Sequence, residues 1–114
     1  MRDDRARLSD ILEAIERIER YTARGRELFV QDELLQTWVV HHIQIIGEAA
    51  RTISETLRNT HPEIPWRQII AMRHIHVHNY FGVDAEEVWS AVENDLPDLK
   101  KKTQAILKQL EVEK

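Results

Sequence analysis

The sequence contains no cysteine and little glycine or proline. Without cysteine, disulfides and thiolate metal or redox sites are excluded. Glycine and proline occur three times each, which is too seldom for a loop-rich fold. No apolar run is long enough to span a bilayer, and the charged residues that follow Met1 make a signal peptide unexpected. We therefore expect a soluble cytoplasmic protein that does not contact membranes.

The sequence also has fewer basic than acidic residues. Sixteen lysines and arginines against 20 acidic residues give a formal net charge of −4. A protein that coats nucleic acid without specificity needs a broad basic face, so this class is excluded. An acidic protein can still hold a small cationic pocket, and its surface suits a basic partner.

What the chain does contain is amphipathic helix, and the first predicted helix has one stripe at offsets of three and four, made of Leu8, Ile11, Leu12, Ile15, Ile18 and Thr22. The 114 residues of the chain predict a single domain over 1–114, folded as an all-α, up-and-down bundle of four to five helices. We expect the helices at about 4–23, 33–58 and 65–79 and from 84 onward, the last kinked or split at Pro97. Asp32 and Asp84 are placed to act as N-caps, and Gly25 as a C-cap.

Apolar side chains cover more of the circumference of the predicted helix over 33–58 than a single intramolecular partner usually buries. Dimer packing is an economical explanation, with the long second helix and the helix over 65–79 forming the contact. Gly47 lies inside this helix, where glycine costs about 1 kcal/mol relative to alanine, so a packing reason is expected. The sequence Gly47–Ala50 would let another backbone approach closely.

The stretch with most chemical content runs from Arg73 to Tyr80 and holds three of the six histidines. Histidine exchanges protons near neutral pH, and arginine suits phosphate, so the pairing favours phosphodiester chemistry. On a continuous helix, His78 would lie well round from Arg73. A tight pair then needs either a facing second copy or a change of direction near His78; the spacing favours a site shared by two chains.

Each of these residues also has a structural interpretation. Arg73 could be a partly buried arginine that pairs with Glu48 or with an acid across a dimer. His78 could satisfy carbonyls at a helix C-terminus, and Tyr80 could be a core aromatic with a solvated hydroxyl. His74 is expected to support the site or bind substrate. His74 and His78 have the i, i+4 spacing of metal ligands, but no third ligand is evident, so no metal site and no cofactor are predicted.

Two further histidines, His41 and His42, are adjacent in the predicted second helix. They point to different sides, and neither has a second ligand at metal spacing on its own helix. We expect them to be packing or surface residues.

With these motifs, the chain resembles the HepT-like ribonuclease toxins of the HEPN superfamily. Their signature is an arginine, four to six residues, a histidine and often, one residue later, a tyrosine; here these are Arg73, His78 and Tyr80. Further matching segments are ILEAI at 11–15, IIGEAA at 45–50, HPEIPW at 61–66, YFGVD at 80–84 and DLP at 95–97. The resemblance covers nearly the whole chain.

The resemblance implies a helical homodimer whose two signature helices line one cleft, and cleavage of RNA without metal. Arg73 and His78 would be catalytic, with His74 and Tyr80 binding substrate or supporting the site. It also implies a type VII toxin–antitoxin system, in which a minimal nucleotidyltransferase antitoxin transfers AMP to Tyr80 and so silences the toxin.

Three function classes follow for testing. The first is the toxin endoribonuclease. The second is a non-catalytic helical partner of a nucleotidyltransferase, and the third is a structural dimer. Loss of RNA cleavage in Arg73→Ala and His78→Ala, without loss of folding, separates the first class from the other two.

Overall fold

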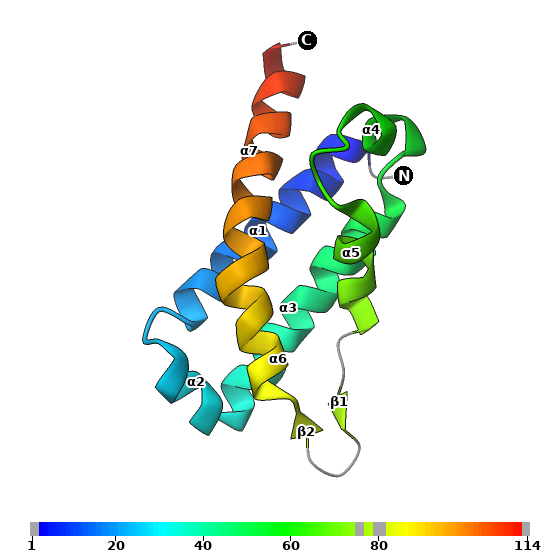
Figure 1. The fold of residues 1–114 in the computed structure, drawn as a ribbon. Helices are drawn as coiled ribbons and strands as arrows, with labels where there is room; N and C mark the ends of the chain where they lie inside the picture. The colour runs from blue at the N-terminus through cyan, green and yellow to red at the C-terminus, as the bar shows by residue number, and fades with distance from the viewer. Residues whose placement is uncertain (1–2, 75–76, 79–81, 113–114) are drawn as a thin grey trace.

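Helices make up most of the chain that the computed structural model describes, which is residues 3–74, 77–78 and 82–112. The predicted all-α class is confirmed, with one addition, a very short β-hairpin (Figure 1). The elements are α1 Asp4–Tyr21, α2 Arg26–Gln31, α3 Glu33–Thr52, α4 Glu55–Thr60, α5 Trp66–Ala71, the 3-10 turn η1 Met72–His74, β1 Val77–His78, β2 Gly82–Val83, α6 Ala85–Ser90, the π-helical turn η2 Ala91–Asp95, and α7 Leu96–Val112.

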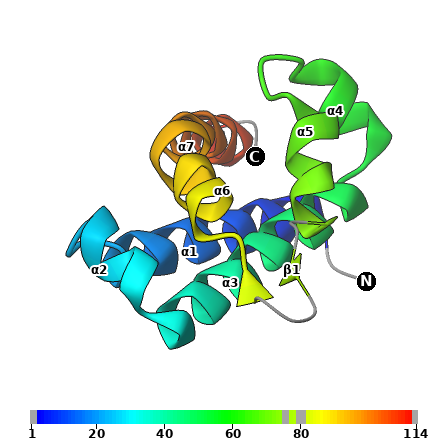
Figure 2. The same cartoon turned by 60° about the horizontal axis from the view of Figure 1, so that its bottom comes forward.

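Helices α1 and α3 form the base on which the other elements pack. Figure 2 shows α6 and α7 above this pair on one side and α4 and α5 on the other. Helix α7 packs on α1, while α5, η1 and β2 pack on α3. The turn η1, which carries Arg73, is therefore supported by α3 as well as by α5.

The core forms where the apolar stripes of α1, α3 and α7 meet. On α1 the predicted stripe is confirmed, since Leu8, Ile11, Ile15 and Ile18 are all buried. Helix α3 contributes Val39, Val40, Ile43, Ile46 and Ala50. Helix α7 adds Leu96, Leu99 and Ile106.

Side-chain caps fix the helix starts. The predicted N-cap Asp32 accepts a hydrogen bond from the Leu35 backbone N–H at 3.0 Å, and Asp84 accepts one from Glu87 at 3.1 Å. The predicted C-cap Gly25 is wrong: α1 ends at Tyr21, and Gly25, with φ of +97°, directly precedes α2. Glycine suits that backbone angle, which side chains with a Cβ rarely adopt.

The single helix predicted over 33–58 is wrong, because α3 stops at Thr52 and α4 begins at Glu55. Ile53 is extended, and Ser54 caps α4 by accepting from the Leu57 N–H at 3.1 Å. Ser54 in turn donates its N–H and its hydroxyl to the Asp4 carboxylate, at 2.8 and 2.6 Å. A contact from the start of α1, fifty residues away in sequence, thus ends the helix.

The helix predicted over 65–79 is also wrong beyond His74. Helix α5 tightens into η1, and Val77–His78 then form a strand that pairs antiparallel with Gly82–Val83, His78 opposite Gly82. Histidine and β-branched residues are weak helix formers, and the hairpin offers the backbone alternative hydrogen-bond partners. The change of direction considered for His78 therefore occurs within the chain.

The break expected at Pro97 takes the form of a wide turn. The chain passes from α6 through the π-helical turn η2 into α7, and the Leu96 N–H bonds to the Ala91 carbonyl. Proline has no N–H to continue the α-helical pattern, and the π turn directly before it absorbs the mismatch.

Gly47 is needed for close packing, as predicted, but the backbone that approaches it belongs to the same chain. A Cβ at this position would lie 2.6 Å from the Arg73 backbone nitrogen and 2.8 Å from the Arg73 Cβ. Both distances are shorter than real Cβ atoms show. Only glycine lets η1 lie directly on α3 here.

We predict that Ile46→Ala lowers the free energy of unfolding by about 2–5 kcal/mol, because Ile46 is fully buried between α3 and its neighbours. Urea unfolding measures this change. Thr37→Ala on the same helix is the control, since Thr37 is exposed, and its effect should stay within about 0.5 kcal/mol. Equal effects of the two substitutions would contradict the core described above.

We also predict that Gly47→Ala destabilises the protein by about 1–3 kcal/mol despite the better helix propensity of alanine. The new methyl group must push the backbone of Arg73 away from α3. Thr37→Ala, at an exposed position of the same helix, is the control and should be near neutral. A Gly47→Ala protein as stable as the parent in urea would refute the close approach.

Candidate functional site

Arg73 lies in η1, and its side chain contacts α3. Its Nη1 donates to Glu48 Oε1 at 3.2 Å, and the side chain is 32% exposed. The pairing with Glu48 considered from the sequence is therefore present within one chain. One such contact uses only one of the five N–H donors of a guanidinium. The Nε atom is enclosed and has no hydrogen-bond partner among the described residues.

Glu48 contacts two arginines at once. Its Oε2 accepts from Arg51 Nη2 at 3.1 Å and from Arg51 Nε at 3.3 Å, while Oε1 faces Arg73. The hydrogen bond from Arg73 and then that from Arg51 hold the pKa of the Glu48 carboxyl below its ordinary value of 4.5. The carboxylate stays charged at neutral pH and holds the Arg73 side chain against α3.

His78 is described through its backbone only, as the second residue of β1. The strand rules out the helix C-terminus considered for it, and it removes the i, i+4 helical spacing to His74. Tyr80, the predicted modification site, lies outside the described residues. The structure thus places Arg73 and the backbone of His78 on η1 and β1, which are consecutive elements of the chain.

His74 faces a different side from Arg73. It is exposed and lines a groove of about 370 Å³ between α5 with η1 and α6 with η2. Gln68, Glu87, Ser90 and Asp95 line the same groove. The predicted supporting residue therefore borders a groove next to η1, whereas Arg73 turns toward α3.

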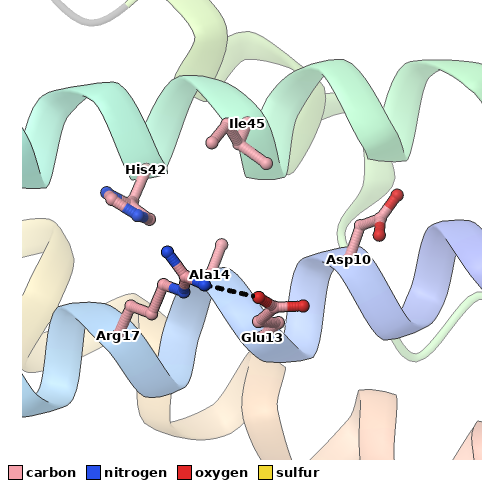
Figure 3. Close-up of a pocket in the computed structure, with 6 residues that line it drawn as sticks. All are labelled: Asp10, Glu13, Ala14, Arg17, His42 and Ile45. Carbon is pink, nitrogen blue, oxygen red and sulfur yellow. Dashed lines mark hydrogen bonds and ion pairs between the residues drawn. The ribbon is translucent and has the colours of Figure 1, made fainter.

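A second hollow, of about 190 Å³, lies between α1 and α3 (Figure 3). Arg17 and Glu13 pair there at 2.9 Å, and His42 faces them from α3. His42 is buried and its Nδ1 lies 2.8 Å from the Trp38 carbonyl, while His41 is exposed. Both match the predicted packing or surface roles, and neither Arg73 nor His74 lines this hollow.

Arg51 is a residue of the cluster around Glu48 that was not predicted from the sequence. Its signal is present in the sequence, because Arg51 follows Glu48 by three residues on one helix, a spacing at which side chains meet. Glu48 was considered as a partner of Arg73, but its second arginine became evident only from the contacts.

Two searches of the described part of the chain gave no candidates. Among residues 3–74, 77–78 and 82–112, no group of three or more histidine, aspartate or glutamate side chains is placed to hold a metal ion. In the same ranges, no helix combines the length and the apolar composition needed to cross a bilayer.

Comparison with known proteins gives a consistent picture. The family model described as "Ribonuclease HepT-like" matches residues 11–106. "Probable ribonuclease HepT" of Thermococcus cleftensis is 43% identical over 105 residues, which cover 89% of this chain and 93% of the relative. "Putative RNase MJ1380" of Methanocaldococcus jannaschii is 33% identical over 106 residues, covering 92% and 97%.

A further relative comes from a different organism. "Putative RNase TTE0752" of Caldanaerobacter subterraneus is 35% identical over 108 residues, which cover 94% of this chain and 96% of the relative. No solved structure matches the chain at a significant level.

The matched range spans α3 and the positions of Arg73 and His78. The resemblance stated from the sequence is confirmed, and so is the predicted enzyme class, an endoribonuclease. This chain belongs to the ribonuclease HepT-like family.

Proposed function

We propose that this protein is the toxin of a type VII toxin–antitoxin pair and cleaves RNA without a metal ion. The observation that carries the proposal is the placement of Arg73. Its guanidinium is held at the surface by Glu48, directly before the strand that contains His78. A fixed cation and a titratable imidazole close in sequence suit a phosphodiester substrate.

The nucleophile in this reaction is the 2′-hydroxyl of the RNA. His78 removes its proton, and the 2′-oxygen attacks the adjacent phosphorus. The bond from phosphorus to the 5′-oxygen then breaks, and that oxygen takes up a proton. The products are a 2′,3′-cyclic phosphate and a 5′-hydroxyl. Arg73 binds the phosphate and stabilises the negative charge that develops on its oxygens.

The proposal includes a homodimer, because the reaction needs both a base and an acid. Two copies of His78, one from each protomer, provide them. The contact would involve α3 and the segment from Arg73 to Tyr80. Leu34 and Trp38 on α3, which are 82% and 43% exposed, are apolar surface that such a contact can cover.

We further propose that the protein acts in the cytoplasm and that an antitoxin regulates it there. A minimal nucleotidyltransferase antitoxin transfers AMP from ATP to the hydroxyl of Tyr80, two residues after His78, and pyrophosphate leaves. The added anionic nucleotide fills the cleft and repels RNA. The alternative function is a non-catalytic partner of a nucleotidyltransferase. It agrees equally well with the structure if Arg73 only pairs with Glu48. The cleavage rates of Arg73 and His78 variants decide between the two functions.

We predict that the purified protein cleaves RNA in the presence of EDTA and leaves DNA of the same sequence intact. His78→Ala should lower the cleavage rate by about 100-fold to 10,000-fold, and Arg73→Ala by about 100-fold to 1,000-fold. Gel analysis of products and circular dichroism of each variant measure activity and folding. His41→Ala, at an exposed histidine, is the control and should cleave normally.

Two results would refute this mechanism. One is full activity in both folded variants. The other is cleavage of an RNA whose scissile ribose carries 2′-deoxy or 2′-O-methyl, because neither can supply the nucleophile.

We further predict that co-expression with the cognate nucleotidyltransferase adds mass to the protein in steps of one adenylyl group and abolishes cleavage. Tyr80→Phe, which lacks the acceptor hydroxyl, should gain no such mass and stay toxic to the cell. Tyr21→Phe is the matched control and should be modified and silenced like the parent. Mass spectrometry that places the adenylyl group on another residue would contradict the assignment.

A further inference from the structure

Glu48 joins two guanidinium groups that come from different elements. Arg73 belongs to η1 and contacts one carboxylate oxygen, and Arg51 belongs to α3 and contacts the other. The two guanidinium groups therefore contact the same carboxylate, although 21 intervening residues separate the two arginines in sequence.

This cluster is open to solvent and carries a positive charge. The side chains of Arg51 and Glu48 are 49% and 52% exposed, and that of Arg73 is 32% exposed. Two guanidinium groups against one carboxylate leave a formal charge of +1, within a chain whose net charge is −4. A phosphate reaching Arg73 from solvent thus meets a second arginine next to it.

Arg51 keeps donors for such a ligand. Its Nε and Nη2 face Glu48 along one edge of the guanidinium plane, and Nη1 lies at the other edge. An exposed ion pair between residues three apart on a helix adds little to stability. Removing Arg51 should therefore leave the fold intact, so that any effect on RNA can be attributed to the site.

We propose that Arg51 binds an RNA phosphate next to the scissile one, so that Arg51 and Arg73 contact two phosphates of the same strand. This inference rests on the proposed function, in which Arg73 binds the scissile phosphate. Arg51 is a substrate-binding residue here and takes no part in proton transfer. The subsite recognises the backbone and not the base, so it contributes to affinity for RNA rather than to the choice of sequence.

Two substrates separate the role of Arg51 from that of Arg73. A dinucleotide has only the scissile phosphate, whereas a longer unstructured oligoribonucleotide also supplies its neighbours. Arg51→Ala should raise KM for the longer RNA about fivefold to tenfold and lower the salt slope of its binding by about 0.7. Its kcat, and the cleavage of the dinucleotide, should stay within about twofold of the parent.

Conservative and control variants sharpen the test. Arg51→Lys keeps the charge and should restore most of the salt slope. Arg17→Ala removes another arginine that pairs with a glutamate on its own helix, at 2.9 Å on α1, and it should leave both substrates unaffected. Fluorescence anisotropy with a 2′-deoxy-substituted oligonucleotide measures binding independently of cleavage.

The outcomes distinguish this inference from the proposed function. Cleavage of the longer RNA by Arg51→Ala with the parent KM and salt slope would overturn the inference and leave the ribonuclease mechanism standing. An inactive parent protein would refute the mechanism, and the anisotropy measurement would still test Arg51. A parent protein that binds no RNA would overturn both.

Discussion

The packing of η1 on Gly47 is the constraint on which the candidate site depends. The Arg73 backbone occupies the space that a Cβ at position 47 would need. This contact brings the Arg73 side chain within reach of Glu48, the next residue of α3. It also fixes the point from which the chain continues toward the β1–β2 hairpin. Close packing of this kind transmits small displacements, so the position of Arg73 is set by α3.

The charged side chains beside this packing contact make the site suitable for an anionic substrate. Glu48 holds the guanidinium in place, and the pKa of its carboxyl is lowered by the arginines that it contacts. The carboxylate is therefore charged at neutral pH. With Arg51 on its other oxygen, the cluster keeps a net positive charge, and a locally cationic spot on an acidic protein can attract phosphate at short range.

Much of the fold and part of the site could be predicted from the sequence. Helical periodicity predicted the buried stripe of α1, and local capping chemistry predicted the N-caps Asp32 and Asp84. The motif around Arg73 and His78, with its flanking segments, predicted the family. The errors fall where local preference was weak. Ser54 fits a helix or a cap, and the hydrogen bonds from Ser54 to Asp4 select the cap.

The sequence by itself determined the all-α class, the residue types of the site and the family, because each follows from short-range patterns along the chain. The tertiary structure decided which groups meet. Periodicity carries no information on which backbone will approach Gly47, on which carboxylate oxygen each arginine will contact, or on where a helix yields to a hairpin. Those outcomes depend on packing between elements far apart in sequence, and only the folded chain brings these elements together.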